Sequence, residues 1–381
     1  MITRIESRHY RCLRANGQNI GPLQVLVGAN GSGKSVFLDV LRFLSSFMSE
    51  GLSKAIEYRT PNFYDLVWLR EGTCFELAVE ASPPMSRVPA PTSTTIRYEV
   101  GVKLDPRSNV VSVSKEQATL RSAEGSKIVI DRNEARVVFR AESPDNTLAN
   151  YPDFKFGNVS ALGNVDERFP SCVWLRELLQ QRIQAIALED RKLRAPSPPA
   201  QVAGKVLDGS NLAHLVFLVE MQSEIWNRWI LHLRTALPDL ESIRSVLRSE
   251  DNHRYLMLSF KNGVQVPSWV VSDGTLRLLA LTILPYLPSF GEVYLIEEPE
   301  TGVHPTALET IYQSLSSVYD GQIFMTSHSP VLLNLPKLEE LLCFQKTDEG
   351  SRIIRGDEHP ALRDWKRDVS MSDLFAAGVL G

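Results

Sequence analysis

The chain has 381 residues, of which 43% are hydrophobic and 23% charged, and its formal net charge is −4 at pH 7. This length can bury two or three domain-sized cores. The composition excludes a disordered chain and one built from membrane-spanning segments. The negative charge argues against a protein whose whole surface binds nucleic-acid phosphates, although it does not exclude a local basic groove.

The N-terminal residues lack the apolar run and small-residue cleavage site of a secretory signal, so we expect a cytoplasmic protein with no membrane partner. Four cysteines are widely spaced, and none of them forms a CxxC pair: Cys12, Cys74, Cys172 and Cys343. We therefore expect neither a zinc site nor a disulfide framework.

A strand, a glycine-rich turn and a helix follow one another early in the chain. Residues 23–27 are a short apolar run typical of a buried strand, and from Lys34 onward apolar residues recur at helical spacing. The turn between them, Gly28-Ala29-Asn30-Gly31-Ser32-Gly33-Lys34-Ser35, fits the pattern G-x-x-x-x-G-K-[ST]. Such glycines let backbone N–H groups converge on phosphate oxygens at the start of a helix.

Two side chains of this loop have defined tasks in phosphate chemistry. Lys34 is expected to reach the β- and γ-phosphates of a nucleotide, and the Ser35 hydroxyl to bind Mg²⁺. A plain strand-to-helix turn would explain the glycines but not a Lys-Ser pair at this offset. The nucleotide-binding residues predicted here are Gly28, Asn30, Gly31, Gly33, Lys34 and Ser35.

The middle of the chain changes pattern twice. Residues 66–143 alternate in the manner of an antiparallel sheet, whereas residues 174–194 and 211–236 have helical spacing. From about residue 254 strands and helices alternate again, with short apolar strands at 293–296 and 323–325. There is no internal repeat and no heptad run long enough for a coiled-coil arm.

Two carboxylates follow the apolar strand at 293–296. Because the carboxyl ends of strands line the ligand crevice in open α/β sheets, Glu297 is a candidate for holding Mg²⁺ through water. Glu298 is then free to polarise the attacking water as a general base. A bare Glu-Glu pair at a strand end is more often simply solvated, but the buried strand before it and the Pro-Glu after it favour a site.

Together with three further stretches, these motifs resemble the ABC-type ATPase heads of the structural-maintenance-of-chromosomes (SMC) and OLD classes, including stand-alone AAA_21-like ATPases associated with phage defence. Val271-Ser272-Asp273-Gly274-Thr275-Leu276-Arg277 is similar to the signature motif of that group. The resemblance implies that Ser272 and Gly274 of one subunit cap the γ-phosphate bound to the loop of another. On its own, Ser-Asp-Gly-Thr is typical of a turn and a helix cap.

The second stretch, Ile323-Phe324-Met325-Thr326-Ser327-His328-Ser329-Pro330, resembles the strand that delivers a switch histidine to the γ-phosphate. The third stretch, Glu300-Thr301-Gly302-Val303-His304-Pro305, resembles the segment after the acidic strand that runs along the dimer interface in that family. The resemblance therefore implies the switch role for His328 and a place near the nucleotide for Arg11. It departs from the family pattern at Glu297, where Asp is commoner, and it identifies no glutamine that senses Mg²⁺.

The resemblance implies an α/β fold, an ABC-ATPase head with a mixed central sheet, a phosphate loop, an antiparallel β subdomain and a helical lobe. We expect residues 1–150 to form the N-terminal part of the head, 151–250 the lobe and 251–381 the C-terminal part. ATP and Mg²⁺ are the expected cofactors, and an ATP-sandwiched homodimer or higher oligomer is the expected assembly.

The predicted function is ATP hydrolysis by a sensor or motor subunit of a separate effector, for example a nuclease, in antiviral defence. We expect no nuclease domain after His328, because only about 50 residues follow it and they hold no cluster of Asp and Glu for two-metal chemistry. Two alternatives stay open: a DNA-repair or recombination ATPase that grips DNA directly, and a non-hydrolysing scaffold in which ATP cements oligomers. A transporter subunit is disfavoured because no surface for a membrane partner can be recognised.

Overall fold

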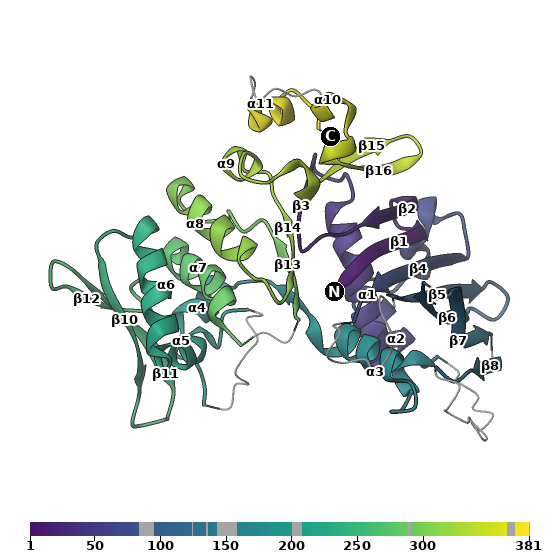
Figure 1. Ribbon diagram of the computed structural model, residues 1–381, viewed down its shortest axis with the longest axis horizontal. Helices are drawn as coiled ribbons and strands as arrows, with labels where there is room; N and C mark the ends of the chain where they lie inside the picture. Colours follow the sequence, from purple (N-terminus) through teal and green to yellow (C-terminus); the bar gives the residue numbers. More distant parts are fainter. Residues whose placement is uncertain are drawn as a thin grey trace.

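The computed structural model describes residues 1–83, 95–123, 125–134, 136–142, 158–199, 208–288, 291–363 and 370–380. Figure 1 shows a central sheet with an antiparallel sheet on its right and a helical lobe on its left. None of the helices in these residues combines the length and the apolarity that crossing a membrane requires.

The antiparallel sheet has seven strands in the order β2-β1-β4-β5-β6-β7-β8. Its strands alternate buried and exposed residues, because one face packs on the core and the other meets water. The sheet predicted for residues 66–143 is confirmed, and the N-terminal hairpin extends it. The bounds are β1 Ile2–Tyr10, β2 Leu13–Asn19, β4 Cys74–Ala81, β5 Thr95–Asp105, β6 Val110–Ser122, β7 Gly125–Asn133 and β8 Arg136–Phe139.

The central sheet has six strands in the order β16-β15-β3-β14-β13-β9, all parallel except β16. Strands β3 and β14 are buried along their whole length, as expected of parallel strands covered on both faces. The bounds are β3 Leu23–Gly28, β9 Ile183–Ile186, β13 Val293–Glu297, β14 Gln322–Thr326, β15 Leu341–Thr347 and β16 Gly350–Arg355.

One core lies on each face of the central sheet. Leu295 and Phe324 face the core that the antiparallel sheet and helix α1 (Lys34–Glu50) complete. Ile296 and Met325, one residue further along, face the core of the helical lobe. This alternation fixes the register of β13 and β14, so both strands end at the same edge.

The lobe holds helices α5, α6, α7 and α8 and a three-stranded meander of β10, β11 and β12. The helices predicted for residues 211–236 are confirmed, with a break between α5 and α6. The bounds are α4 Asp190–Arg194, α5 Leu212–Glu220, α6 Ser223–Ala236, α7 Asp273–Thr282, α8 Pro305–Ser316, β10 Leu240–Leu247, β11 Arg254–Phe260 and β12 Gln265–Pro267.

The helix predicted for residues 174–194 is wrong in its middle. Helix α3 (Pro170–Glu177) runs into a π turn, Leu178–Arg182, and then into strand β9, which pairs with β13. A place at the edge of a buried sheet suits the β-branched Ile183 and Ile186 and outweighs the helical spacing. The central sheet therefore includes β9, a strand from residues 151–250, which were predicted to form the lobe.

The remaining helices are short. Those after β14 lie in the same part of the molecule as β15 and β16, at the top of Figure 1. Their bounds are α2 Leu52–Glu57, α9 Pro330–Leu333, α10 Pro360–Arg363 and α11 Met371–Ala376, with 3₁₀ turns at Phe63–Leu66, Trp68–Arg70, Leu162–Asn164, Leu284–Tyr286, Leu338–Glu340 and Gly356–Glu358.

Candidate functional site

The loop between β3 and α1 requires glycine at two positions for steric reasons. Gly28 and Gly33 have φ angles of 147° and 103°. A Cβ atom on Gly28 would lie 2.3 Å from the carbonyl oxygen of Phe344, and one on Gly33 would lie 2.5 Å from the Ser351 hydroxyl. The glycines thus let the loop pass close to β15 and β16 at the end of the buried sheet.

Lys34 is 7% exposed and lies over this loop. Its ammonium donates to the carbonyl oxygens of Gly28 at 2.6 Å and Ala29 at 3.0 Å. Burial lowers the pKa of Lys34, while Glu298 and Glu297 act in the opposite direction. A cation held by neutral carbonyls can turn toward an anion that enters the loop.

Asn30 and Gly31 lie exposed at the tip of the same loop. Gly31 has a φ angle of 74°, and a Cβ atom there would meet open space. Between Gly31 and Gly33, Ser32 is buried with a hydroxyl that has no hydrogen-bond partner. The loop therefore presents accessible backbone at its tip and an unused donor below it.

Ser35 and Glu297 meet at the start of α1 and the end of β13. The Ser35 hydroxyl donates to Oε2 of Glu297 at 2.5 Å, and Arg42 binds Oε1 of Glu297 at 2.7 Å. A hydroxyl and a carboxylate beside a phosphate loop are hard oxygen donors that fit Mg²⁺, which keeps several waters and needs only one or two protein ligands. Within the described ranges no group of three or more His, Cys, Asp or Glu side chains could hold a metal.

Glu298 has an unusual backbone, with a φ angle of 48°. A side chain in this left-handed region costs about 1–3 kcal/mol and such residues cluster at functional sites. The Glu298 amide donates to the Thr326 carbonyl at 3.1 Å, which fixes the turn to β14. Its Oε1 atom lies 3.8 Å from Nε2 of His328. The strained turn thus directs the carboxylate toward the predicted switch histidine.

The segment that carries His328 is held by Glu300. Oε1 of Glu300 accepts hydrogen bonds from the Ser327 hydroxyl at 2.8 Å, the His328 amide at 2.7 Å and the Ser329 amide at 3.0 Å. The sequence placed Glu300 in a stretch expected along the dimer interface and gave the side chain no role of its own. The signal was a third carboxylate in the Glu-Glu-Pro-Glu run, but only the structure shows that it binds the neighbouring strand end.

The electrostatics around His328 favour the neutral imidazole. Burial lowers the pKa of His328, and the nearby Lys34 ammonium lowers it further. Glu298 and Glu300 act in the opposite direction without reversing the shift. A neutral ring at pH 7 can offer one nitrogen as an acceptor and the other as a donor.

Ser272 and Gly274 lie at the start of α7. The Ser272 hydroxyl caps the helix by accepting from the Thr275 amide at 3.3 Å, and the residue is exposed. A Cβ atom on Gly274 would lie 2.5 Å from the carbonyl oxygen of Gly302, in the loop after the acidic pair. The contacts described for these two residues join them to the lobe and not to the loop at Gly28–Ser35.

Arg11 projects from a tight turn after β1, with a φ angle of 50°. Its Nη1 atom lies 3.6 Å from Asp39 on α1, and its buried Nε has no hydrogen-bond partner. Asp39 also binds the Tyr10 hydroxyl at 2.6 Å and Arg59 at 2.8 Å. The Asp39 carboxylate on α1 therefore binds both the end of β1, through Tyr10 and Arg11, and the turn after residues 52–57, through Arg59.

Replacing Asp39 with Asn is expected to destabilise the fold by about 2 kcal/mol, because the buried Arg59 guanidinium loses its charged partner. Urea denaturation followed by circular dichroism would show a lower midpoint with an unchanged slope. The exposed Asp320→Asn change is the matched control and should leave the midpoint in place. An unchanged midpoint for Asp39→Asn would contradict the structural role given to this carboxylate.

A cleft of about 670 Å³ opens beside Gly31 and Arg11. Its walls combine apolar and charged side chains, and its volume lies in the range of small-molecule sites. The residues that line it are Arg11, Cys12, Gly31, Asp65, Val67, Trp68, Leu69, Arg70, Lys346, Thr347, Asp348, Gly350 and Ser351. Sequence reasoning missed Trp68 and Leu69, because no pattern links that 3₁₀ turn to the loop.

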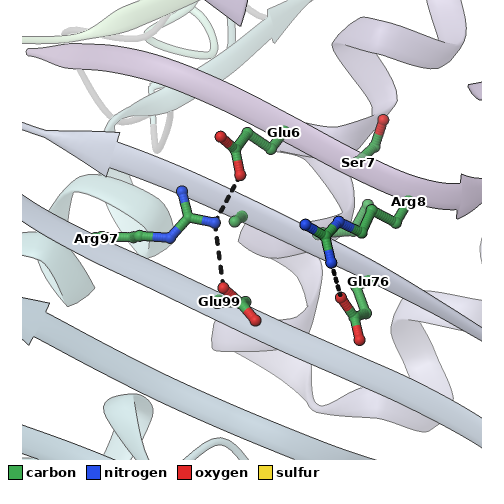
Figure 2. A pocket seen from close by; sticks show the side chains of 8 residues that line it. Glu6, Ser7, Arg8, Glu76, Arg97 and Glu99 are labelled. Atoms are coloured by element: carbon green, nitrogen blue, oxygen red, sulfur yellow. Dashed lines mark hydrogen bonds and ion pairs between the residues drawn. The ribbon is translucent and has the colours of Figure 1, made fainter. Parts of the chain in front are cut away.

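A second hollow lies on the outer face of the antiparallel sheet and holds ion pairs (Figure 2). Arg97 binds Glu6 at 2.6 Å and Glu99 at 3.1 Å, and Arg8 lies 3.7 Å from Glu76. Its volume of about 10 Å³ admits at most a water molecule. We interpret it as a charged, solvated face of the sheet.

Comparison with known proteins identifies related sequences. A family model, AAA_21, described as "AAA domain, putative AbiEii toxin, Type IV TA system", matches residues 23–76 and 130–334, which is more than half of the chain. A protein of Thermus scotoductus named "OLD nuclease" is 21% identical over 390 residues, covering 98% of this chain and 68% of that protein.

Two solved SMC head structures share the fold. An SMC head bound to the C-terminal winged-helix domain of ScpA matches with a TM-score of 0.56 and 12% identity, over 93% of this chain and 97% of that one. An SMC head with an extended coiled coil, bound to the ScpA C-terminal domain derived from Pyrococcus furiosus, gives a TM-score of 0.52 and 12% identity, over 93% and 95%. The predicted α/β head fold and the resemblance to the SMC and OLD classes are confirmed.

Proposed function

The protein belongs to the AAA_21 family of AAA domains, and from this premise we propose that it binds MgATP at Gly28–Ser35 and hydrolyses it between two copies of the chain. The main support is the meeting of three elements at one edge of the central sheet. The ends of β3, β13 and β14 carry the loop, the acidic pair and His328, and these strands are direct neighbours. Phosphate binding, a base and a histidine thus lie where one triphosphate can contact all three.

In this proposal the loop amides and Lys34 bind the β- and γ-phosphates, and the hydrogen bonds from Lys34 to the loop carbonyls are exchanged for bonds to phosphate. Ser35 and Glu297 would hold Mg²⁺, which when bound offsets charge on the β- and γ-oxygens. Glu298 accepts a proton from the attacking water, and His328 donates a hydrogen bond to the γ-phosphate.

The cleft beside Gly31 is the proposed place for the nucleoside. It begins at the tip of the loop, so a nucleotide whose phosphates lie in the loop can extend directly into it. The Trp68 ring and Leu69, which is 59% exposed, offer apolar surface to a base. Arg11 lines the same cleft, and we assign it a contact with the ribose or the α-phosphate.

The second subunit enters this proposal through the signature turn. Ser272 is exposed at the N-terminus of α7, where unpaired amides favour an anion. Its described contacts remain within its own lobe, so we assign its phosphate contact to the loop of a partner molecule. A two-fold dimer then contains two equivalent composite sites.

We assign the protein a role as sensor or motor subunit of a separate effector in antiphage defence. The family description names a toxin of a type IV toxin-antitoxin system, and the Thermus relative is named a nuclease. That relative also contains sequence beyond the 68% that this chain covers. We propose a nuclease or a toxin as the separate effector, because these are the activities that the two names give.

Two measurements test the function. Purified protein should release phosphate from ATP in the presence of Mg²⁺, and light scattering should show a dimer with ATP that is absent without nucleotide. A protein that binds no ATP would refute this function. A monomer whose ATP turnover per chain does not change with protein concentration would refute the two-molecule site. Purification from the native host under defence conditions would identify the effector.

A further inference from the structure

The C-terminal helix α11 lies beside the switch histidine. The ring centroid of Phe375 is 6.2 Å from that of His328, with the two planes at 56°. Phe375 is half-buried and also packs against the core of the lobe. An aromatic ring from the end of the chain therefore covers one side of the imidazole.

Helix α11 is fastened to the segment that follows His328. The Met371 amide donates to the Asn334 side-chain oxygen at 2.9 Å, and the Asn334 amide group donates to the Ser372 hydroxyl at 3.3 Å. Asn334 ends helix α9, which begins directly after Ser329. Met371 is 1% exposed and Leu380 is fully buried, so both ends of the helical segment are anchored.

Two different contacts fix the histidine. Glu300 binds the backbone amide of His328, which sets the path of the chain but leaves the side chain free to rotate. Phe375 contacts the imidazole itself. Nε2 of the imidazole lies 3.8 Å from Oε1 of Glu298, so a ring at this place can limit the rotation that would turn Nε2 away.

We propose that Phe375 is a positioning residue that holds the His328 imidazole in the orientation needed for ATP hydrolysis, an inference that rests on the proposed function. A displaced catalytic group lowers the rate of the chemical step even when substrate binding is intact. The C-terminal helix thereby becomes part of the reaction site through its contact with the switch histidine.

The charges around the imidazole make its titration a second readout. Lys34 faces it from α1, and Glu298 and Glu300 face it from the turn after β13. On α11, Asp373 is exposed and accepts a hydrogen bond from Ser370, away from the ring. Removing Phe375 admits water without changing these charges, so the pKa of His328, which burial lowers, should rise.

The decisive comparison is between Phe375→Ala, Phe375→Tyr and Leu374→Ala. Leu374 lies on the same helix and packs on the same core, so it controls for loosening of α11. We expect Phe375→Ala to lower kcat about tenfold at unchanged KM, since misplaced groups cost up to about a hundredfold. Phe375→Tyr should restore kcat to within about twofold, because it keeps the aromatic ring, and Leu374→Ala should leave most of kcat intact.

An NMR titration of His328, assigned by its loss in His328→Gln, should show a higher pKa in Phe375→Ala than in the wild type. Unchanged kcat in Phe375→Ala, or an equal loss in Leu374→Ala, would overturn the inference. If the wild type shows no turnover, the proposed function has failed, and the titration alone decides whether Phe375 controls the histidine: an unshifted pKa would then refute it.

Discussion

Replacing Glu298 with Gln is expected to lower ATP turnover by at least about a hundredfold, because a general base contributes about 10²–10⁴ to such a rate. The amide keeps the shape of the side chain but cannot take the proton of the attacking water. ATP binding should persist, since Lys34 and the loop amides are untouched. Phosphate release measures the first effect, and equilibrium binding of labelled ATP the second.

The same variant should accumulate as the ATP-bound dimer, which light scattering detects, because the step that dissolves the dimer is blocked. Glu309→Gln is the matched control, since Glu309 is an exposed carboxylate on α8. Turnover that survives in Glu298→Gln would remove this residue from the reaction. A wild type that binds ATP and dimerises without turnover would instead favour the scaffold alternative.

Replacing Lys34 with Ala is expected to weaken ATP binding by about ten- to a hundredfold, because hydrogen bonds to charged groups contribute about 1.5–3 kcal/mol. The substitution removes the cation that the loop carbonyls hold at 2.6 and 3.0 Å. Lys54→Ala is the control, since Lys54 is an exposed lysine on α2. Hydrolysis should fall with binding, because no other described cation lies over the loop in this way.

Cys12 supplies an independent measure of this binding. Its side chain lines the cleft beside Gly31, so bound ATP should protect it from a maleimide. The exposed Cys74 would react as well, and a Cys74→Ser background removes that signal. If ATP protects Cys12 from the maleimide in this background, and Lys34→Ala abolishes the protection, the nucleotide lies in the cleft. Equal labelling with and without saturating ATP would contradict the proposed nucleoside subsite.

The parts of the site that sequence reasoning reached are those set by local chemistry. Gly28, Gly33 and Lys34 belong to one contiguous motif between a strand and a helix, and the acidic pair follows a visibly apolar strand. Parallel pairing of β3, β14 and β13 then brings these local signals together. The role of His328 came instead from the resemblance of residues 323–330 to a strand that carries a switch histidine, since a histidine at a strand end is more often structural.

The parts of the site and fold that the sequence did not predict depend on contacts between distant segments. Strand β9 has helical spacing in isolation and becomes a strand because the edge of β13 is available. Trp68 carries no motif, and the stretches that contain Glu300 and Phe375 gave neither residue a contact. Each of the three acquires its place from the folding of a loop or terminus against the site. Arg42 could have been found, since it lies two turns after Ser35 on the same face of α1.

The central claim, one ATP held by the loop of one molecule and the signature of another, is tested by mixing two inactive variants. Lys34→Ala disables the loop, and Ser272→Arg blocks the exposed signature turn. A mixed two-fold dimer has one site with both defects and one with neither, so activity should rise toward about a quarter of the wild-type value at equal concentrations. A mixture no more active than its separate components would show that the site is not shared between two molecules.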